Sequence, residues 1–167
     1  MTKNKLSQAG NTLIELMIAS TIITLILVAV AISMMFSLKR EALNRYQQTA
    51  IDLADEGVEF LGFERASLGW NDFVNQYGPA GGNEVNNWCF YQSETSKVVV
   101  ASGQCSLTIV EQKIDFAGIT FLRDVEIRSL TDGTITKLQA TIIMRWWPDE
   151  QGERVYQLTH EFSQQDY

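Results

Sequence analysis

The run Leu13–Phe36 constrains what this chain can fold into more than any other part of its sequence. It carries a single charged side chain, Glu15. At about 1.5 Å per residue, a helix of this length is roughly 36 Å long, which is enough to cross the apolar core of a bilayer. The run therefore predicts a membrane-spanning helix. The carboxylate within it is costly unless it lies near the bilayer edge or meets a cation.

The helix is expected to continue beyond the apolar run, because no proline or glycine occurs between Asn11 and Glu56. Apolar residues then recur at steps of three and four, which is the pattern of one buried helical face. The residues of this face are Leu43, Tyr46, Ala50, Leu53, Ala54, Val58 and Leu61. We predict one continuous helix from about Thr12 to about Arg65, with residues 11–38 in the membrane and residues 39–66 amphipathic.

The remainder predicts a loop over residues 67–87, rich in Gly and Asn, and an antiparallel sheet over residues 88–167. Turns are expected at Ser93–Ser96 and at Asp132-Gly133. The predicted strands are Trp88–Gln92, Lys97–Ala101, Cys105–Val110, Thr120–Leu130, Thr134–Trp147 and Arg154–Ser163. A sheet with one apolar face needs a covering layer, and the amphipathic half of the helix can supply it. The fold class is therefore α+β.

Charge and motif content exclude several functions. The net charge is −7 and no basic run follows residue 40, which disfavours a nucleic-acid partner. His160 is the one histidine, and no nucleophile elbow, phosphate loop or metal-ligand spacing occurs. We therefore expect no catalysis, no metal and no cofactor.

Cys89 and Cys105 are the two cysteines of the chain. They could remain two buried thiols or form a disulfide. A location of this part of the chain outside the cytoplasm favours the disulfide. Closing a loop of this size would stabilise the fold by about 3 kcal/mol.

The start of the apolar run has a specific form. A short basic leader ends in Gly10, and Thr12-Leu13-Ile14-Glu15-Leu16 follows at the head of the apolar helix. This arrangement resembles the signal of type IV prepilins, the family of type IV pilins, minor pilins and type II secretion pseudopilins. The resemblance extends from the leader to about Arg40. It implies the lollipop fold of that family, in which a long helix packs on an antiparallel sheet.

The resemblance implies a role for individual residues. A prepilin peptidase cuts after Gly10 on the cytoplasmic side and removes residues 1–10 as a leader. Asn11 becomes the new N-terminus and is N-methylated. Glu15 then pairs with the free amino group of a neighbouring subunit and sets the register of assembly.

The resemblance also implies partners and a location. The partners are prepilin peptidase, other pilin or pseudopilin subunits, the inner-membrane assembly platform and membrane lipid. Residues 11–38 would cross the cytoplasmic membrane once and later form the filament core. Residues 39–167 would be a head domain outside that membrane, in a periplasmic or extracellular filament after assembly.

Two departures from the family pattern refine this interpretation. The first mature residue is usually Phe and is Asn11 here, and Thr24 and Ile32 stand where many major pilins carry Pro or Gly. These differences favour a minor pilin or pseudopilin over an abundant shaft subunit.

Three alternatives remain. The chain could be a membrane-tethered extracytoplasmic binding module that never polymerises, a tethered enzyme, or a protein secreted after cleavage at Ala29-Val30-Ala31. The last is disfavoured because the apolar run Leu13–Phe36 is longer than the usual signal-peptide core of about 7–15 residues.

Overall fold

The part of the chain described by the computed structural model comprises residues 5–79, 84–92, 97–130, 137–148 and 152–164, with side chains from Leu13 onward. The chain divides into two compact units, Met1–Asn44 and Arg45–Tyr167. Helix α1 runs from Lys5 to Leu68 and contributes to both units. The prediction of one continuous helix is confirmed, although α1 begins before Thr12.

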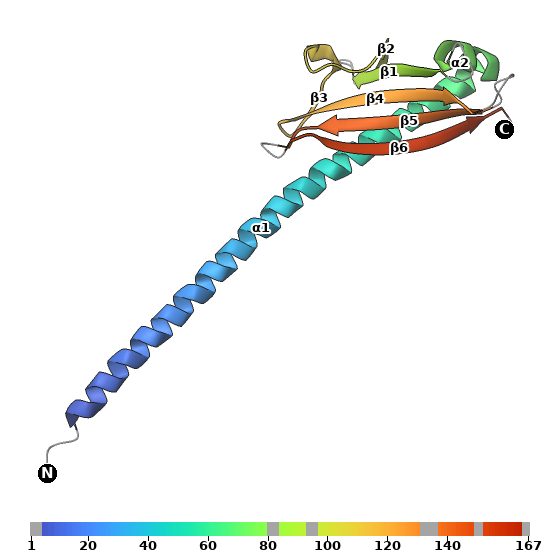
Figure 1. Ribbon diagram of the computed structural model, residues 1–167. Helices are drawn as coiled ribbons and strands as arrows, with labels where there is room; N and C mark the ends of the chain where they lie inside the picture. The colour runs from blue at the N-terminus through green and yellow to red at the C-terminus, as the bar shows by residue number, and fades with distance from the viewer. Residues whose placement is uncertain (1–4, 80–83, 93–96, 131–136, 149–151, 165–167) are drawn as a thin grey trace. The chain divides into compact units, whose positions relative to one another are not determined.

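The second unit contains the sheet (Figure 1). Among the described residues, six antiparallel strands lie in the order β2-β1-β4-β5-β6, with β3 also paired to β4. The elements after α1 are α2 (Trp70–Tyr77), β1 (Val85–Gln92), β2 (Val98–Ser102), the 3-10 turn η1 (Val110–Gln112), β3 (Ile114–Phe116), β4 (Ile119–Ser129), β5 (Lys137–Trp146) and β6 (Arg154–Ser163). The predicted α+β class, a long apolar helix followed by an antiparallel sheet, is confirmed.

The C-terminal part of α1 packs along one face of this sheet (Figure 1). Ala50, Ala54 and Leu61 are completely buried there, as the periodicity predicted. Small residues let the helix approach closely: a Cβ placed at Gly57 would lie 3.0 Å from Cδ1 of Ile142 in β5. The close approach of two elements therefore depends on the small residues of this helical face.

The middle of β4 is buried on both of its faces, unlike a strand with one solvated side. Phe121 and Val125 face α1 and belong to the main core. Leu122 faces the opposite way and packs with Cys89 and Cys105 in a smaller cluster. The loop after β2 thus covers the second face of β1 and β4 around this cluster.

Two details of the predicted order are wrong. The stretch 67–87 is not all loop, because Trp70–Tyr77 forms α2 and β1 already begins at Val85. Phe73 and Tyr77, one helical turn apart, are buried in α2, so their helical spacing outweighed the Gly and Asn content nearby.

Cys105–Val110 does not form the predicted third strand. The Ser106 amide donates to the Gln112 side chain and the Thr108 amide donates to the Ser106 hydroxyl, at 2.7 and 3.2 Å. Such local side-chain bonds compete with strand pairing. The third strand in chain order is instead β3, which pairs with β4. The turns predicted at Ser93–Ser96 and Asp132-Gly133 lie outside the described residues.

Candidate functional site

The apolar part of α1 is entirely exposed in the isolated chain. Every described residue from Leu13 to Glu41 is exposed, and large side chains such as Leu16, Met35 and Phe36 keep 65–72% of their surface accessible. In the described part of the chain, α1 is the one helix long and apolar enough to cross a membrane. A contiguous apolar surface of this kind requires lipid or another apolar surface to cover it.

Three hydroxyl side chains within this stretch are satisfied by the helix itself. The hydroxyls of Ser20, Thr21 and Thr24 each donate to a backbone carbonyl of the preceding turn, at 2.8–2.9 Å. Such bonds allow hydroxyl residues to lie in an apolar environment without an external partner. Glu15 is therefore the conspicuous polar group of the stretch: it is exposed and is the single charge between Leu13 and Leu38.

The residues predicted to act in processing all lie on this helix. Gly10 and Asn11 are in helical conformation, and their side-chain surroundings lie outside what the structure describes. Asn11 and Glu15 are four residues apart, so they lie on the same helical face. This spacing places the amino group that cleavage after Gly10 would create near the Glu15 side of the helix.

The second unit contains an ion pair between a buried arginine and a partly exposed glutamate, and the sequence did not predict it. The Arg123 side chain is completely buried, and its Nη1 lies 2.8 Å from Oε2 of Glu56. The same group donates to the Leu53 carbonyl at 2.7 Å, and Nε donates to the Phe90 carbonyl at 3.3 Å. Burial lowers the pKa of the Arg123 guanidinium, and Glu56 offsets part of that shift. Arg123 thus ties β4 to both α1 and β1.

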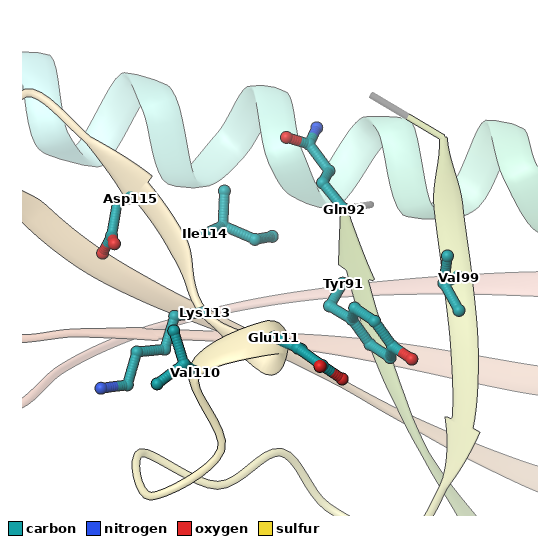
Figure 2. Close-up of a pocket in the computed structure, with 8 residues that line it drawn as sticks. All are labelled: Tyr91, Gln92, Val99, Val110, Glu111, Lys113, Ile114 and Asp115. Atoms are coloured by element: carbon teal, nitrogen blue, oxygen red, sulfur yellow. The ribbon is translucent and has the colours of Figure 1, made fainter. Parts of the chain in front are cut away.

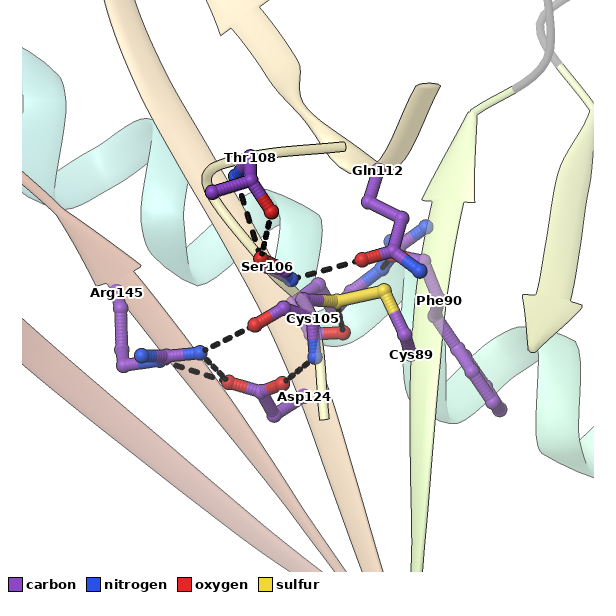
Figure 3. The surroundings of a disulfide bond; sticks show 9 residues. Cys89, Phe90, Cys105, Ser106, Thr108, Gln112, Asp124 and Arg145 are labelled. Carbon is purple, nitrogen blue, oxygen red and sulfur yellow. Dashed lines mark hydrogen bonds and ion pairs between the residues drawn. A yellow bond between two sulfur atoms is a disulfide. The ribbon is translucent and has the colours of Figure 1, made fainter. Parts of the chain in front are cut away.

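A second cluster of polar residues lies on the other face of β4, around the disulfide that joins Cys89 and Cys105 (Figure 3). Asp124 accepts a hydrogen bond from the Cys105 amide at 2.5 Å. Arg145 donates to Asp124 Oδ2 from Nε at 2.7 Å and to the Cys105 carbonyl from Nη2 at 3.1 Å. The segment after β2 is therefore held by one covalent bond and one ionic clamp.

One edge of β4 is shared by two strands, and a groove lies where they part. β1 pairs with β4 up to Asp124, and β3 takes its place from Phe121. The groove has a volume of about 620 Å³, and Tyr91, Glu111 and Lys113 lie on its walls (Figure 2). These side chains do not form the nucleophile and base arrangement that catalysis needs.

Other residues considered for chemistry are dispersed in the fold. His160 is exposed on β6, with its ring edge-on to Phe162 at a centroid distance of 4.7 Å. Within the described ranges, no group of three or more His, Cys, Asp or Glu side chains is arranged to hold a metal ion. The features that stand out are thus structural ties in the second unit and an uncovered apolar helix in the first.

Sequence reasoning could have found Arg123. It occupies a position in the alternation of Thr120–Leu130 where its neighbours on the same face, Phe121 and Val125, are apolar. A charge at an inward position of a strand signals a buried pair, although its partner on α1 cannot be identified from spacing.

Comparison with known proteins bears on the N-terminal stretch. A family model described as the prokaryotic N-terminal methylation motif matches residues 5–38. A search of curated proteins and a search of solved structures each found no match. The matched range contains Gly10, Asn11, Glu15 and the whole exposed apolar run. Residues 5–38 of this chain therefore carry the prepilin-type motif for N-terminal cleavage and methylation.

Proposed function

We propose that this chain is a type IV pilin-like prepilin. It is a structural subunit, cleaved after Gly10 and assembled through residues 11–38 into a type IV pilus or a type II secretion pseudopilus, as a minor component. The observation that carries the proposal is the uncovered apolar helix, exposed from Leu13 onward, with the cleavage and methylation motif at its start.

The exposed helix fits a subunit that is covered in two successive ways. Before assembly, lipid of the inner membrane surrounds the apolar stretch, and the head lies outside the cytoplasm. After assembly, the helices of neighbouring subunits replace the lipid, because apolar helices without charged faces pack against one another as readily as against acyl chains. The required partners are prepilin peptidase, the assembly platform and other pilin subunits.

Glu15 has a specific part in this scheme. A lone carboxylate in an apolar setting is unfavourable, and an incoming amino group removes that penalty. The pairing therefore favours one axial position of a helix against its neighbours, and so sets the register of assembly. No role in catalysis is proposed for any residue.

Processing is tested by the mass of the mature N-terminus. The unaltered chain is expected to begin at Asn11, whereas Gly10→Val is expected to keep residues 1–10, because a branched side chain crowds the scissile bond. Ala31→Val is the matched control, with the same side chain at the alternative signal-peptidase position, and it should still be cleaved before Asn11. Intact mass and N-terminal peptide mass spectrometry of membrane fractions measure all three.

Two other results would contradict the processing proposal. A chain that begins at Ile32, and is lost in Ala31→Val, would identify a secreted protein. A chain that keeps residues 1–10 in every variant would identify a plain membrane anchor.

Assembly is tested at Glu15. Glu15→Gln is expected to be cleaved normally but to reduce incorporation into filaments by tenfold or more, since a loss of about 1.4 kcal/mol of pairing is a factor of ten. Glu15→Asp keeps the charge and should retain most of the incorporation. The ratio of subunit in sheared filaments to subunit in membranes, measured by immunoblot, gives the result. Equal incorporation of the Gln and Asp variants would rule out a role for the charge.

A further inference from the structure

A second groove of the head lies between α2 and the adjoining ends of β1 and β2. Its volume is about 710 Å³, within the range of about 300–1,000 Å³ typical of small-molecule sites. The polar and aromatic residues on its walls are Asn75, Gln76, Asn86, Asn87, Trp88 and Ser102. We call it the amide groove.

The amide groove has an unusual composition for this protein. One residue in five of the chain is charged, yet none of the described residues that line the groove is Asp, Glu, Lys or Arg. A phosphate, a carboxylate or a metal ion would find no opposite charge there. An amide side chain presents both donors and acceptors, which suits a ligand whose own groups both donate and accept.

Part of the wall is already fixed by internal bonds. Asn86 Nδ2 donates to the Gly78 carbonyl at 2.5 Å, and Trp88 Nε1 lies 3.4 Å from the Tyr77 carbonyl that it faces. The Trp88 ring also meets the Tyr77 ring edge-on, at a centroid distance of 5.5 Å. Burial, with Glu64 nearby, raises the pKa of Tyr77 to about 12, so this aromatic support stays neutral. The indole is therefore held in place as a rigid apolar surface.

Other side chains of the wall are free to meet a ligand. In the ranges that the structure describes, the side chains of Asn75 and Ser102 make no hydrogen bond within the protein. The wall thus combines a fixed aromatic ring with unengaged amide and hydroxyl groups.

An extended peptide finds no free strand edge on β1, the strand that carries the Trp88 indole. A peptide that adds to a sheet needs a free strand edge. Trp88 of β1 is paired on both sides, with Ser102 of β2 and with Val125 of β4. β1 therefore offers no unpaired backbone beneath the groove, and recognition there depends on side chains.

We propose that the amide groove binds an uncharged oligosaccharide. The hydroxyl groups of a sugar both donate and accept hydrogen bonds, which matches the free amide and hydroxyl side chains of Asn75 and Ser102. The apolar C–H face of a sugar ring can lie against the Trp88 indole, which is apolar over most of its surface. This activity is independent of filament assembly and does not rest on the cleavage after Gly10.

The test uses the full chain, purified in lauryldimethylamine oxide because that detergent carries no sugar headgroup. Chitotetraose and cellotetraose are the neutral probes, and tetragalacturonate is the anionic control. Isothermal titration is expected to show saturable binding of at least one neutral probe and none of the anionic one. Ser102→Arg, which places a charged and bulky side chain on the wall, should weaken that binding at least tenfold.

Gln104→Arg is the matched control, because it adds the same side chain at an exposed position that does not line the groove. It should bind the neutral probe as the unaltered chain does. Asn75→Leu changes a second exposed residue of the wall, this one on α2. It removes the amide group without a change of charge and should also weaken binding of the neutral probe. Near-ultraviolet circular dichroism reports whether each variant keeps its fold.

Several results would overturn the proposal. One is that neither neutral probe binds. A second is that Ser102→Arg and Gln104→Arg lose binding equally. A third is that tetragalacturonate binds more tightly than the neutral probes. Saturable binding of an uncharged peptide such as N-acetyl-tetraglycine amide in place of the sugars would assign the groove to another class of ligand.

Discussion

Replacement of Arg123 by alanine is expected to lower the free energy of unfolding of the head by about 3–5 kcal/mol, mainly through the cavity and the buried hydrogen bonds that are lost. The guanidinium is completely buried and contacts α1 through Glu56 and Leu53 and β1 through Phe90. Alanine removes these ties together, leaves the Glu56 carboxylate without its cation and opens a cavity between the two layers. The effect is large because the lost partner is buried, not because the ion pair is itself strong.

Arg128→Ala is the matched control on the same strand. Arg128 is 54% exposed and pairs with Glu126 at 3.0 Å, so its loss should cost at most about 1 kcal/mol. Arg123→Met fills part of the cavity and should fall between the two. Equal costs for Arg123→Ala and Arg128→Ala would contradict this account of the buried pair.

Urea denaturation of the full chain in micelles, followed by tryptophan fluorescence, measures these differences. All four tryptophans of the chain, at positions 70, 88, 146 and 147, lie in the second unit. The signal therefore reports on the head and not on the membrane helix.

Removal of the disulfide by the double change Cys89→Ala and Cys105→Ala is expected to lower the free energy of unfolding by about 3 kcal/mol. The bond links β1 to the segment after β2 over a separation of 16 residues. Its loss frees that segment in the unfolded chain and removes part of the small cluster around Leu122. The same fluorescence measurement applies.

The ionic clamp provides a sharper form of this experiment. Asp124 and Arg145 hold the Cys105 backbone independently of the sulfur atoms (Figure 3). Arg145→Ala in the presence of the disulfide should therefore cost less than Arg145→Ala in its absence, by about 0.5 kcal/mol or more. Strict additivity of the two changes would show that the clamp and the disulfide hold different parts of the chain.

The sequence predicted the long elements well, because their signals are repeated many times. The buried face of α1, with Ala50, Ala54 and Leu61 at helical spacing, is present as expected. β6 has the predicted bounds, Arg154–Ser163. Each of these elements contains several residues that favour the same period, so one residue that departs from the pattern does not change the predicted structure.

The failures lie where few residues decide the local structure. α2 has only eight residues, and its aromatic spacing is masked by the Gly and Asn around it. The segment from Cys105 to Val110 has apolar residues that suggested a strand, yet Leu107 and Ile109 are exposed and Asp124 and Gln112 bind its backbone. Those partners are distant in sequence or act through side chains, and no local pattern reveals them.

The site residues divide in the same way. Gly10 and Glu15 were predicted as site residues from a motif within one short stretch, and the family model covers the same stretch. Arg123 could have been recognised as a buried charge from the strand alternation, but its partners could not. Asp124 and Arg145 were missed, because each acquires its importance only when three separate elements come together. The amide groove belongs to this second class, since α2, β1 and β2 all contribute to its wall.

The adjacent pair Arg123 and Asp124 has a consequence for how β4 selects its place in the sheet. A strand buried on both faces carries apolar residues on both, so hydrophobicity alone does not distinguish its correct alignment from one shifted by a single residue. Such a shift exchanges the faces of the strand. Asp124 would then face the carboxylate of Glu56, and Arg123 would face the guanidinium of Arg145. Each contact would bring like charges together at a partly buried site. Misaligned pairing is therefore penalised twice, whereas the native alignment pairs both charges.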